Sequence, residues 1–414
     1  MKAIVLGGTH AHVQLINNLK KRGYYCFLVD HYENPVAKEI ADEHVRISSL
    51  DKEKVLEFAR LIKPELVIST AVDQANLTAC YVSEKLNLPA PYSYQTARNV
   101  TDKVLMKKKM EACCIPTARF IYLENIKETG WCDLGFPLVV KPADNCGSKG
   151  VFKVGDISLL HSYLNIAFEF SRTKRVIIEE YKEGREICAD CFLQEGEIHI
   201  ISIYEKFNIY SPATVIQCFR SIRPVGISPG AEKEIQKIVR QIASAFNLKN
   251  TSLFVQTIVN EDTVNVIEFG ARAAGGLAYK ATELATGFDA INATVDSFLH
   301  IPAHIAFKNP EFYYSTNSIY GRPAVFGRIT GHEELLDKGV IETFSCYKTK
   351  GMELTSHMSS SDRVGGFIVK AKSKGALFEK TETAMKELEI YDINNRPVMI
   401  KPMFEKVTDH HLIL

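Results

Sequence analysis

The sequence has almost no net charge and no long hydrophobic run. Lysine and arginine number 50 and aspartate and glutamate 49, which leaves a formal net charge of +1. Because the charges are this evenly balanced, the protein has no net electrostatic field that would attract nucleic acid or an anionic membrane surface. The short apolar run near the N-terminus ends at Gly7 and Gly8, far below the length of a signal peptide or a membrane span. We therefore expect a cytoplasmic protein with neither a nucleic-acid nor a membrane partner.

A disulfide framework, internal repeats and low-complexity segments are missing as well. Ten cysteines in 414 residues are typical of free thiols in a reducing compartment. One CxxC occurs, Cys188 to Cys191, but the surrounding EICADCFL favours a strand. Residues three apart on a strand point to opposite faces, so we do not expect one zinc ion or one disulfide to join them. The composition, 46% hydrophobic and 24% charged, is that of a globular protein.

The length predicts two or three subdomains. In the first, short apolar strands at residues 3–6, 25–29 and 66–68 alternate with helical patterns, one ending at Gly23 and one over residues 75–86. This alternation predicts a parallel sheet, and ligands of such sheets bind beyond the carboxyl ends of the strands. The segment LPAPY, residues 88–92, resists both helix and central strand and marks the end of this subdomain.

Polar residues gather at the expected rim of this sheet. The segment GGTHAH, Asp30 and the turn at residues 69–73 each follow a predicted strand. The strict G-x-G-x-x-G of dinucleotide-binding proteins is missing, so that function is not assigned. His10 or Thr9 is a candidate substrate contact, as is Asp73. Metal binding by the histidines of this loop is less favoured.

A glycine-rich stretch, KPADNCGSKGV, occupies residues 141–151. Residues 138–141 are expected to pair with residues 151–154 across a tip that combines backbone N–H groups with positive charge. Such a tip suits phosphate groups. Upstream, a helix predicted over residues 101–114 carries Lys103 at its start, where a cation opposes the helix dipole. That position indicates an anionic partner for Lys103, whereas the other lysines of this helix are assigned to a solvated face.

A second informative segment is the hairpin formed by residues 253–259 and 264–269. A turn centred on Asp262 would place Gln256 opposite Glu268, with the Cβ atoms about 5 Å apart. Two such side chains can bind hard cations together with the phosphates of a nucleotide, but taken alone the pair slightly favours a polar contact on a solvated face. Arg272 and the turn Gly275-Gly276 follow directly.

The remaining pattern is that of an α+β protein. Strands are predicted at residues 176–178, 187–193 and 198–206, and an amphipathic helix at 235–246. In the C-terminal part, the segment 321–328, strand-like 366–370 and helices at 332–338 and 374–388 suggest an α+β cap. Arg328 and Arg363 are the candidates for chemistry in this last part.

The order of these motifs resembles the ATP-grasp superfamily, specifically its carboxylate-amine ligases. The resemblance rests on a strand followed by KP and GSKGV, then on IIEEYKEGREI, a helix, and the hairpin that ends in VIEFGAR. It implies an N-terminal Rossmann-like parallel α/β domain at residues 1–92, a two-lobed ATP-grasp domain at 93–305, and a small α+β cap at 306–414.

The resemblance also implies roles for individual residues. Lys103 and Lys141 would hold the phosphates of ATP, and Lys141 and Arg272 would act in catalysis. Glu268 would bind magnesium and Glu186 the ribose hydroxyls. The remaining implied nucleotide contacts are those of the phosphate loop and of the adenine-binding hinge: Ser148, Gly150, Glu179, Glu180, Tyr181 and Lys182. Gly275, Gly276, His10, Asp73 and Arg328 are the candidate substrate contacts.

Two positions depart from the pattern of the family. Gln256 stands where an acidic residue is common, and Gly270 where an asparagine is common. An amide oxygen can still coordinate magnesium, but a glycine has no side chain to do so. We therefore expect ATP with one magnesium ion, bound by Glu268 with Gln256, and leave a second ion open.

The implied reaction is phosphorylation of a small carboxylate by ATP, followed by attack of an amine on the acyl phosphate, so that an amide or peptide bond forms and ADP and phosphate are released. One alternative is an ATP-dependent carboxylase that activates bicarbonate. Another is a catalytically silent nucleotide-binding protein, which the departures at Gln256 and Gly270 favour. The oligomeric state stays open, with a homodimer as one candidate.

Overall fold

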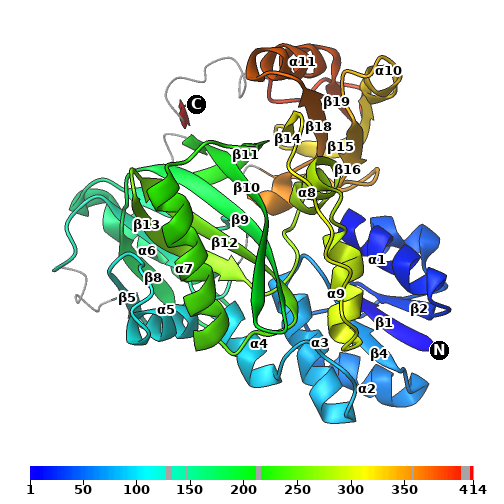
Figure 1. The fold of residues 1–414 in the computed structure, drawn as a ribbon. Coiled ribbons are helices and arrows are strands. Elements are labelled where there is room, and N and C mark those ends of the chain that lie inside the picture. Colours follow the sequence, from blue (N-terminus) through cyan, green and yellow to red (C-terminus); the bar gives the residue numbers. More distant parts are fainter. Residues whose placement is uncertain (127–132, 146, 211–215, 356–358, 402–410, 414) are drawn as a thin grey trace.

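The computed structural model describes residues 1–126, 133–145, 147–210, 216–355, 359–401 and 411–413. The chain begins with a parallel four-stranded sheet in the order β3-β2-β1-β4. Its elements are β1 (Lys2–Leu6), α1 (His10–Lys21), β2 (Tyr25–Val29), η1 (Val36–Ile40), β3 (Glu43–Val45), α2 (Lys52–Ile62), β4 (Leu66–Ile68) and α3 (Asp73–Leu86). The predicted N-terminal parallel sheet is thus confirmed, and in Figure 1 it is the blue part of the molecule.

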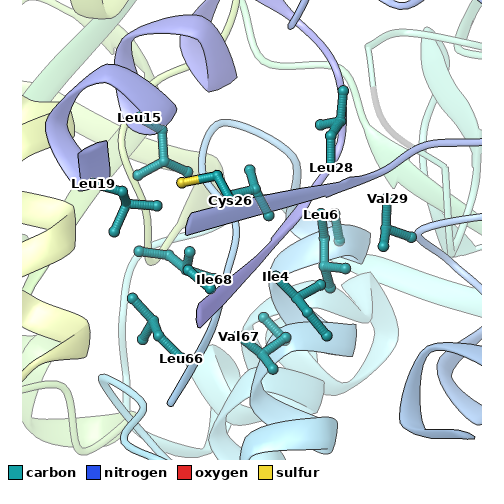
Figure 2. Close-up of a cluster of buried hydrophobic side chains, with 14 of the residues drawn as sticks. Ile4, Leu6, Leu15, Leu19, Cys26, Leu28, Val29, Leu66, Val67 and Ile68 are labelled. Atoms are coloured by element: carbon teal, nitrogen blue, oxygen red, sulfur yellow. The ribbon is translucent and has the colours of Figure 1, made fainter. Parts of the chain in front are cut away.

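The core of this sheet is made by its own strands and by α1. In Figure 2, Cys26 of β2 and Ile68 of β4 lie on the side of the sheet where Leu15 and Leu19 of α1 pack, whereas Ile4 of β1 and Val67 of β4 lie on its other side; all of these side chains are buried. Strands that are buried on both faces need such continuous apolar runs. Helix α9 (Ala290–Phe298), from much later in the chain, also packs into this core and contacts α1.

The next region contains a smaller antiparallel sheet, in the order β5-β8-β6-β7. Two helices, α4 (Tyr94–Thr101) and α5 (Lys103–Ala112), precede it, and its elements are β5 (Phe120–Leu123), β6 (Leu138–Pro142), β7 (Phe152–Val154), α6 (Ile157–Phe170) and β8 (Val176–Glu180). The predicted pairing of residues 138–141 with residues 151–154 is confirmed by the register Leu138 to Val154 and Val140 to Phe152. Helix α6 covers one face of this sheet with Leu160, Leu164 and Ala167.

A large sheet forms the centre of the molecule, in the order β13-β12-β9-β10-β11-β14-β18-β16. Its first five members are β9 (Arg185–Gln194), β10 (Glu197–Tyr210), β11 (Ile216–Arg223), β12 (Thr251–Asn260) and β13 (Thr263–Gly270), and β20 (His411–Ile413) pairs with β10. Helix α7 (Pro229–Ala245) packs against this sheet through its apolar stripe (Figure 1). The register places Gln256 opposite Glu268, as predicted, and both cysteines of the CxxC on β9 are free thiols.

The C-terminal part extends the large sheet. Strands β14 (Tyr313–Ile319), β16 (Thr343–Cys346) and β18 (Gly365–Ala371) add to it beyond β11, so the central and C-terminal regions share one sheet. The other elements are α8 (Ala278–Thr286), β15 (Ala324–Thr330), α10 (His332–Asp337), β17 (Glu353–Leu354), α11 (Lys374–Glu387) and β19 (Glu389–Asp392). Within the described ranges, no helix is both long enough and apolar enough to cross a membrane.

Candidate active site

A cavity of about 420 Å³ lies where all of these regions meet. Asp73 approaches it from the N-terminal region, Lys141 from the small sheet, Glu268 from the large sheet, and Arg363 from the C-terminal region. The residues proposed from sequence that line the cavity are Asp73, Lys103, Lys141, Ser148, Glu179, Glu180, Tyr181, Lys182, Glu186, Gln256, Glu268, Arg272, Gly275 and Gly276. Residues as far apart in the chain as Asp73 and Arg363 are therefore brought to one site.

Two of the proposed substrate contacts lie elsewhere. The Nε2 atom of His10 is 2.8 Å from the carbonyl oxygen of Cys346, and its ring packs against Tyr347, which itself lines the cavity. Arg328 is exposed on β15, with its guanidinium over the ring of Tyr391. Neither side chain is part of the cavity wall, so both proposed contacts are corrected to positions outside it.

The glycine-rich turn after β6 is held against the C-terminal region. Gly147, Ser148 and Gly150 all have positive φ angles, of 66°, 61° and 76°. The backbone N–H of Ser360 donates to the carbonyl of Gly147 at 2.9 Å, and a Cβ atom at residue 147 would lie 1.6 Å from the Ser360 hydroxyl oxygen. Only glycine fits both the backbone conformation and this contact. Ser148 lines the cavity, while Gly150 lies behind it against Phe170 and Pro142.

A buried carboxylate joins two lysines at the base of this turn. Glu179 of β8 lies 2.5 Å from the Nζ atom of Lys141 and 2.6 Å from that of Lys107. Burial opposes ionisation of Glu179, but the two ammonium groups outweigh it and lower its pKa. Burial also lowers the pKa of Lys107 to about 8. The side chain of Glu179 is therefore fully engaged in fixing two cations.

Lys107 was assigned to a solvated face, and the structure corrects that. Its side chain is 2% exposed and also donates to the hydroxyl of Thr117 at 2.6 Å. The sequence did contain a signal, because Lys107 lies four residues after Lys103 and the two therefore share one face of α5.

Glu268 is surrounded by ammonium groups. Its carboxylate lies 3.2 Å from the Nζ atom of Lys103 and retains 29% exposure towards the cavity. Burial opposes ionisation, yet the charges of Lys103, Lys141 and Lys206 prevail and lower the pKa of Glu268 to about 2. A carboxylate that stays ionised and faces a cavity is a suitable ligand for a hard cation.

Lys206 is a second cation that the sequence reasoning missed. It lies on β10 directly opposite Glu186 of β9, with its Nζ atom 3.1 Å from the Glu186 carboxylate. The other oxygen of that carboxylate accepts from the amide of Asn208 at 2.6 Å. The alternation Glu205-Lys206-Phe207-Asn208 on a strand was the available signal, since it places Lys206 and Asn208 on one face.

The Arg272 guanidinium is oriented by Asp73. Two parallel hydrogen bonds join them, from Nε to Oδ1 at 2.7 Å and from Nη2 to Oδ2 at 2.5 Å. Nη1 donates to the carbonyl of Ala273 at 2.9 Å, and the guanidinium stacks over the ring of Phe254. A bidentate pair of this kind fixes direction as well as distance. Asp73 thus positions Arg272.

This pairing predicts a defined effect for Asp73→Asn. One of the two charge-assisted hydrogen bonds is lost and the guanidinium is free to turn, so we expect the rate of ATP consumption to fall about tenfold to a hundredfold. Steady-state ADP release is the measurement. Asp51→Asn, which changes a carboxylate that caps α2, is the matched control. An unchanged rate in Asp73→Asn would contradict the positioning role.

Arg363 brings a further cation to the opposite wall. Its side chain donates to the hydroxyl of Tyr320 at 3.2 Å and to the carbonyl of Cys218 at 3.3 Å. Among the described residues, no carboxylate lies within 4.0 Å of its guanidinium nitrogens. Burial opposes the charge of Arg363, but electrostatic interactions with Tyr320 and Cys218 and the hydrogen bond to Tyr320 outweigh it and raise its pKa, so the guanidinium stays charged. A charged guanidinium facing a cavity without an acidic partner indicates an anionic ligand.

The donor set fits a hard cation. In the described part of the chain, no group of three or more histidine, cysteine, aspartate or glutamate side chains gathers in a metal-binding arrangement. Glu268 is the carboxylate that faces the cavity beside the lysines, and oxygen atoms from a phosphate ligand would have to complete the coordination shell.

Residues 134–281 match the protein family described as ATP-grasp domain. This stretch contains both the glycine-rich turn and the hairpin that carries Glu268. This part of the chain is therefore an ATP-grasp domain. The structural class predicted from the motif order is therefore confirmed.

Three similar proteins illustrate the relationship. A formate-dependent phosphoribosylglycinamide formyltransferase from Janthinobacterium sp. (strain Marseille) is 24% identical over 78% of this chain and 79% of its own. The L-amino acid ligase from Bacillus licheniformis superposes with a TM-score of 0.77 at 18% identity, covering 94% and 98% of the two chains. The biotin carboxylase domain of the Hydrogenobacter thermophilus 2-oxoglutarate carboxylase, solved with MgADP and bicarbonate, gives 0.76 at 16%, covering 97% and 92%. The two superpositions show a shared fold over most of the chain.

Proposed function

We propose that this protein is an ATP-dependent carboxylate-amine ligase. The observation that carries the proposal is the convergence of Lys103, Lys141 and Arg272 with the ionised Glu268 on one cavity, within a chain that contains an ATP-grasp domain. A set of fixed cations around one metal-binding carboxylate suits the triphosphate of ATP. The names of the relatives, among them a ligase and a formyltransferase, agree with ligation in general.

The nucleotide would lie between the small and the large sheet. We assign adenine to the segment Glu180 to Lys182. The amides of Glu180 and Tyr181 already donate to the carbonyls of Arg119 and Pro137, at 3.0 and 3.1 Å, whereas no backbone carbonyl of the described residues accepts from the Lys182 amide. That amide is thus available to a base. Glu186 also lines the cavity and suits the ribose hydroxyls.

The chemistry consists of two substitutions. An oxygen of the substrate carboxylate attacks the γ-phosphorus of ATP, the bond to the bridging oxygen breaks, and an acyl phosphate and ADP result. The nitrogen of an amine then attacks the acyl carbon, phosphate leaves, and the amide forms with loss of a proton. Magnesium, when bound at Glu268, would neutralise charge on the phosphates.

The residues of the chain would contribute charge and orientation. Lys103 and Lys141 would hold the phosphates from opposite sides of the cavity, with Lys141 fixed by Glu179. Arg272, oriented by Asp73, would face the transferred phosphoryl group. Ser148 and the glycine-rich turn, closed against Ser360, would exclude water from the acyl phosphate. Positioning and electrostatic stabilisation of this kind supply most of the rate in phosphoryl transfer.

We assign the acid substrate to the wall formed by Arg363 and Gly276. A Cβ atom at residue 276 would lie 3.2 Å from Nη1 of Arg363, so the glycine leaves this nitrogen open to the cavity. Arg272 is neutralised by Asp73, but Arg363 has no such partner among the described residues. A carboxylate is therefore the group that this wall would bind most strongly.

The assignment predicts the effect of Arg363→Met. Loss of a charged, bidentate partner should raise the KM for the acid about a hundredfold, while the KM for ATP changes less than about threefold. Initial rates at varied acid and varied ATP separate the two constants. Arg328→Met, which removes an exposed arginine from β15, is the control and should leave both constants unchanged. An equal rise in both would contradict the assignment.

The proposed function itself is tested by ADP release. Purified protein is incubated with ATP and magnesium, and with amino acids and small carboxylic acids, with and without bicarbonate. Release that requires both an acid and an amine supports ligation. Release with bicarbonate in place of an organic acid would instead support a carboxylase, in line with the bicarbonate complex of the Hydrogenobacter relative. Tight binding of ATP without any release would support a silent nucleotide-binding protein.

A further inference from the structure

We propose that this site holds a single divalent ion, on Glu268, and that the ammonium group of Lys206 takes the place of a second ion. The inference rests on the proposed function, because it assumes that a nucleotide triphosphate is the ligand. It is carried by the three side chains that surround the Glu268 carboxylate on its own hairpin and on the next strands: Gln256, Phe254 and Lys206.

Both ends of the Gln256 amide are already used. The amide takes the orientation that its hydrogen-bond partners require. In it, the nitrogen donates to Oε1 of Glu268 at 3.2 Å and the oxygen accepts from the Nζ atom of Lys206. An ion bound to that oxygen would lie beside an ammonium group and be repelled by it. Gln256 is therefore a bridge between Glu268 and Lys206, and not the second metal ligand that its place opposite Glu268 suggests.

The neighbouring position on the hairpin is closed by an aromatic ring. Gly270 follows Glu268 on the same face of β13 and pairs with Phe254 of β12. A Cβ atom at residue 270 would lie 2.3 Å from the ring of Phe254 and 3.0 Å from the Asp73 carboxylate. No longer side chain fits there. The space in which an oxygen ligand from residue 270 would stand is filled by a ring that supports Arg272.

Lys206 is built into the wall as a fixed charge. Its side chain is 19% exposed, lines the cavity, and is anchored by Glu186 at 3.1 Å. Asn208 holds the same carboxylate at 2.6 Å, which fixes the direction of the ion pair. The ammonium thus reaches from the Glu186 end of the cavity to the Glu268 end. A lysine fixed in this position can stabilise the negative charge of phosphates, and unlike a metal ion it does not have to bind from solution.

The experiment counts ions rather than turnover. Mn²⁺ replaces Mg²⁺, and its binding to the chain saturated with a non-hydrolysable ATP analogue is titrated by electron paramagnetic resonance. The wild-type chain should bind one Mn²⁺. Lys206→Met and Gln256→Glu should each also bind one, since the first adds no ligand and the second pairs its new carboxylate with Lys206. Only the double variant Lys206→Met/Gln256→Glu, which removes the cation and supplies a carboxylate, should bind two.

Rates give an independent readout. Lys206→Met should release ADP about a hundredfold more slowly than the wild type. At millimolar Mn²⁺ the double variant should release ADP at least about tenfold faster than Lys206→Met. Lys237→Met, on the exposed side of α7, is the control for loss of a lysine charge. Circular dichroism and binding of the analogue establish that each variant is folded.

Two results would overturn the inference. Two ions on the wild-type chain would show that Gln256 and Lys206 leave a second site open. One ion on a folded double variant that binds the analogue would show that these residues do not decide the count, and that Lys206 serves only as the counter-ion of Glu186. A wild-type chain that binds no ATP analogue would overturn the proposed function together with this inference.

Discussion

Replacing Glu268 by glutamine is expected to lower the rate of ADP release by about a thousandfold or more, which corresponds to about 4 kcal/mol of transition-state stabilisation. Glutamine has nearly the shape of glutamate but no charge. Glu268 is the cavity-facing carboxylate that Lys103 approaches, and the surrounding ammonium groups keep it ionised. Without it, a divalent ion would lose its charged protein ligand. Steady-state ADP release at saturating ATP and magnesium measures the effect.

The matched control for this variant is Glu261→Gln. Glu261 is an exposed glutamate in the turn of the same hairpin and is not part of the cavity lining. Its replacement makes the same chemical change on the same two strands and should leave the rate within about twofold, as surface substitutions usually do. A rate for Glu268→Gln within tenfold of the wild type, in protein that melts normally, would contradict the placement of the metal site.

Replacing Glu179 by glutamine is expected to destabilise the nucleotide-free protein by about 3 to 5 kcal/mol at pH 7. This carboxylate lies between the ammonium groups of Lys107 and Lys141, and all three side chains are at least nine-tenths buried. The variant leaves two cations without a counter-charge in the interior. Urea unfolding followed by circular dichroism gives the free energy of unfolding.

The effect should depend on pH in a defined direction. The pKa of Glu179 is lowered in the folded protein, so its contribution to stability is complete above its ordinary value of 4.5 and is lost as the pH falls below that value. The difference between wild type and Glu179→Gln should therefore stay constant from pH 7 to about pH 5 and shrink in more acidic solution. A difference that grows on acidification would contradict the charge assignment.

Glu180→Gln provides the comparison for this prediction. Glu180 is the next residue on β8, but its partners Arg119 and Lys182 are 66% and 35% exposed. Solvent screens such pairs, and we expect a loss of about 1 kcal/mol or less. Equal losses in the two variants would show that β8 is sensitive to any change there, and not that Glu179 holds a buried pair of lysines.

The charged side chains of the cavity come from elements that belong to different hydrophobic cores. Lys107 and Lys103 come from one face of α5, Glu179 from the centre of the small sheet, and Glu268 from the edge of the large one. Each is anchored by an ion pair to a different element. Charges fixed in this way need little rearrangement when a ligand of opposite charge arrives, and this is the condition for electrostatic catalysis.

The sequence by itself determined the elements and the local pairings. The strands and helices that were predicted follow from hydrophobic period, which is a local property, and most of their bounds agree with the structure to within a few residues. Helices α2, α6, α8 and α9 were not predicted. The pairing of Gln256 with Glu268 was also predictable, because a short turn fixes the register of its two strands. The motif order further indicated an ATP-grasp domain, which the family match over residues 134–281 confirms.

Tertiary structure decided which side chains meet. Local sequence does not show that Lys206 donates to the Gln256 amide or that Phe254 fills the space beside Gly270. Nor does it show that Ser360 donates to the carbonyl of Gly147. The same holds for Arg363, which reaches the cavity, and for Arg328, which does not. The physical reason is that periodicity and turns specify neighbours along a strand or helix, whereas contacts between distant segments depend on how whole elements pack, and packing is decided by the combined burial of many residues at once.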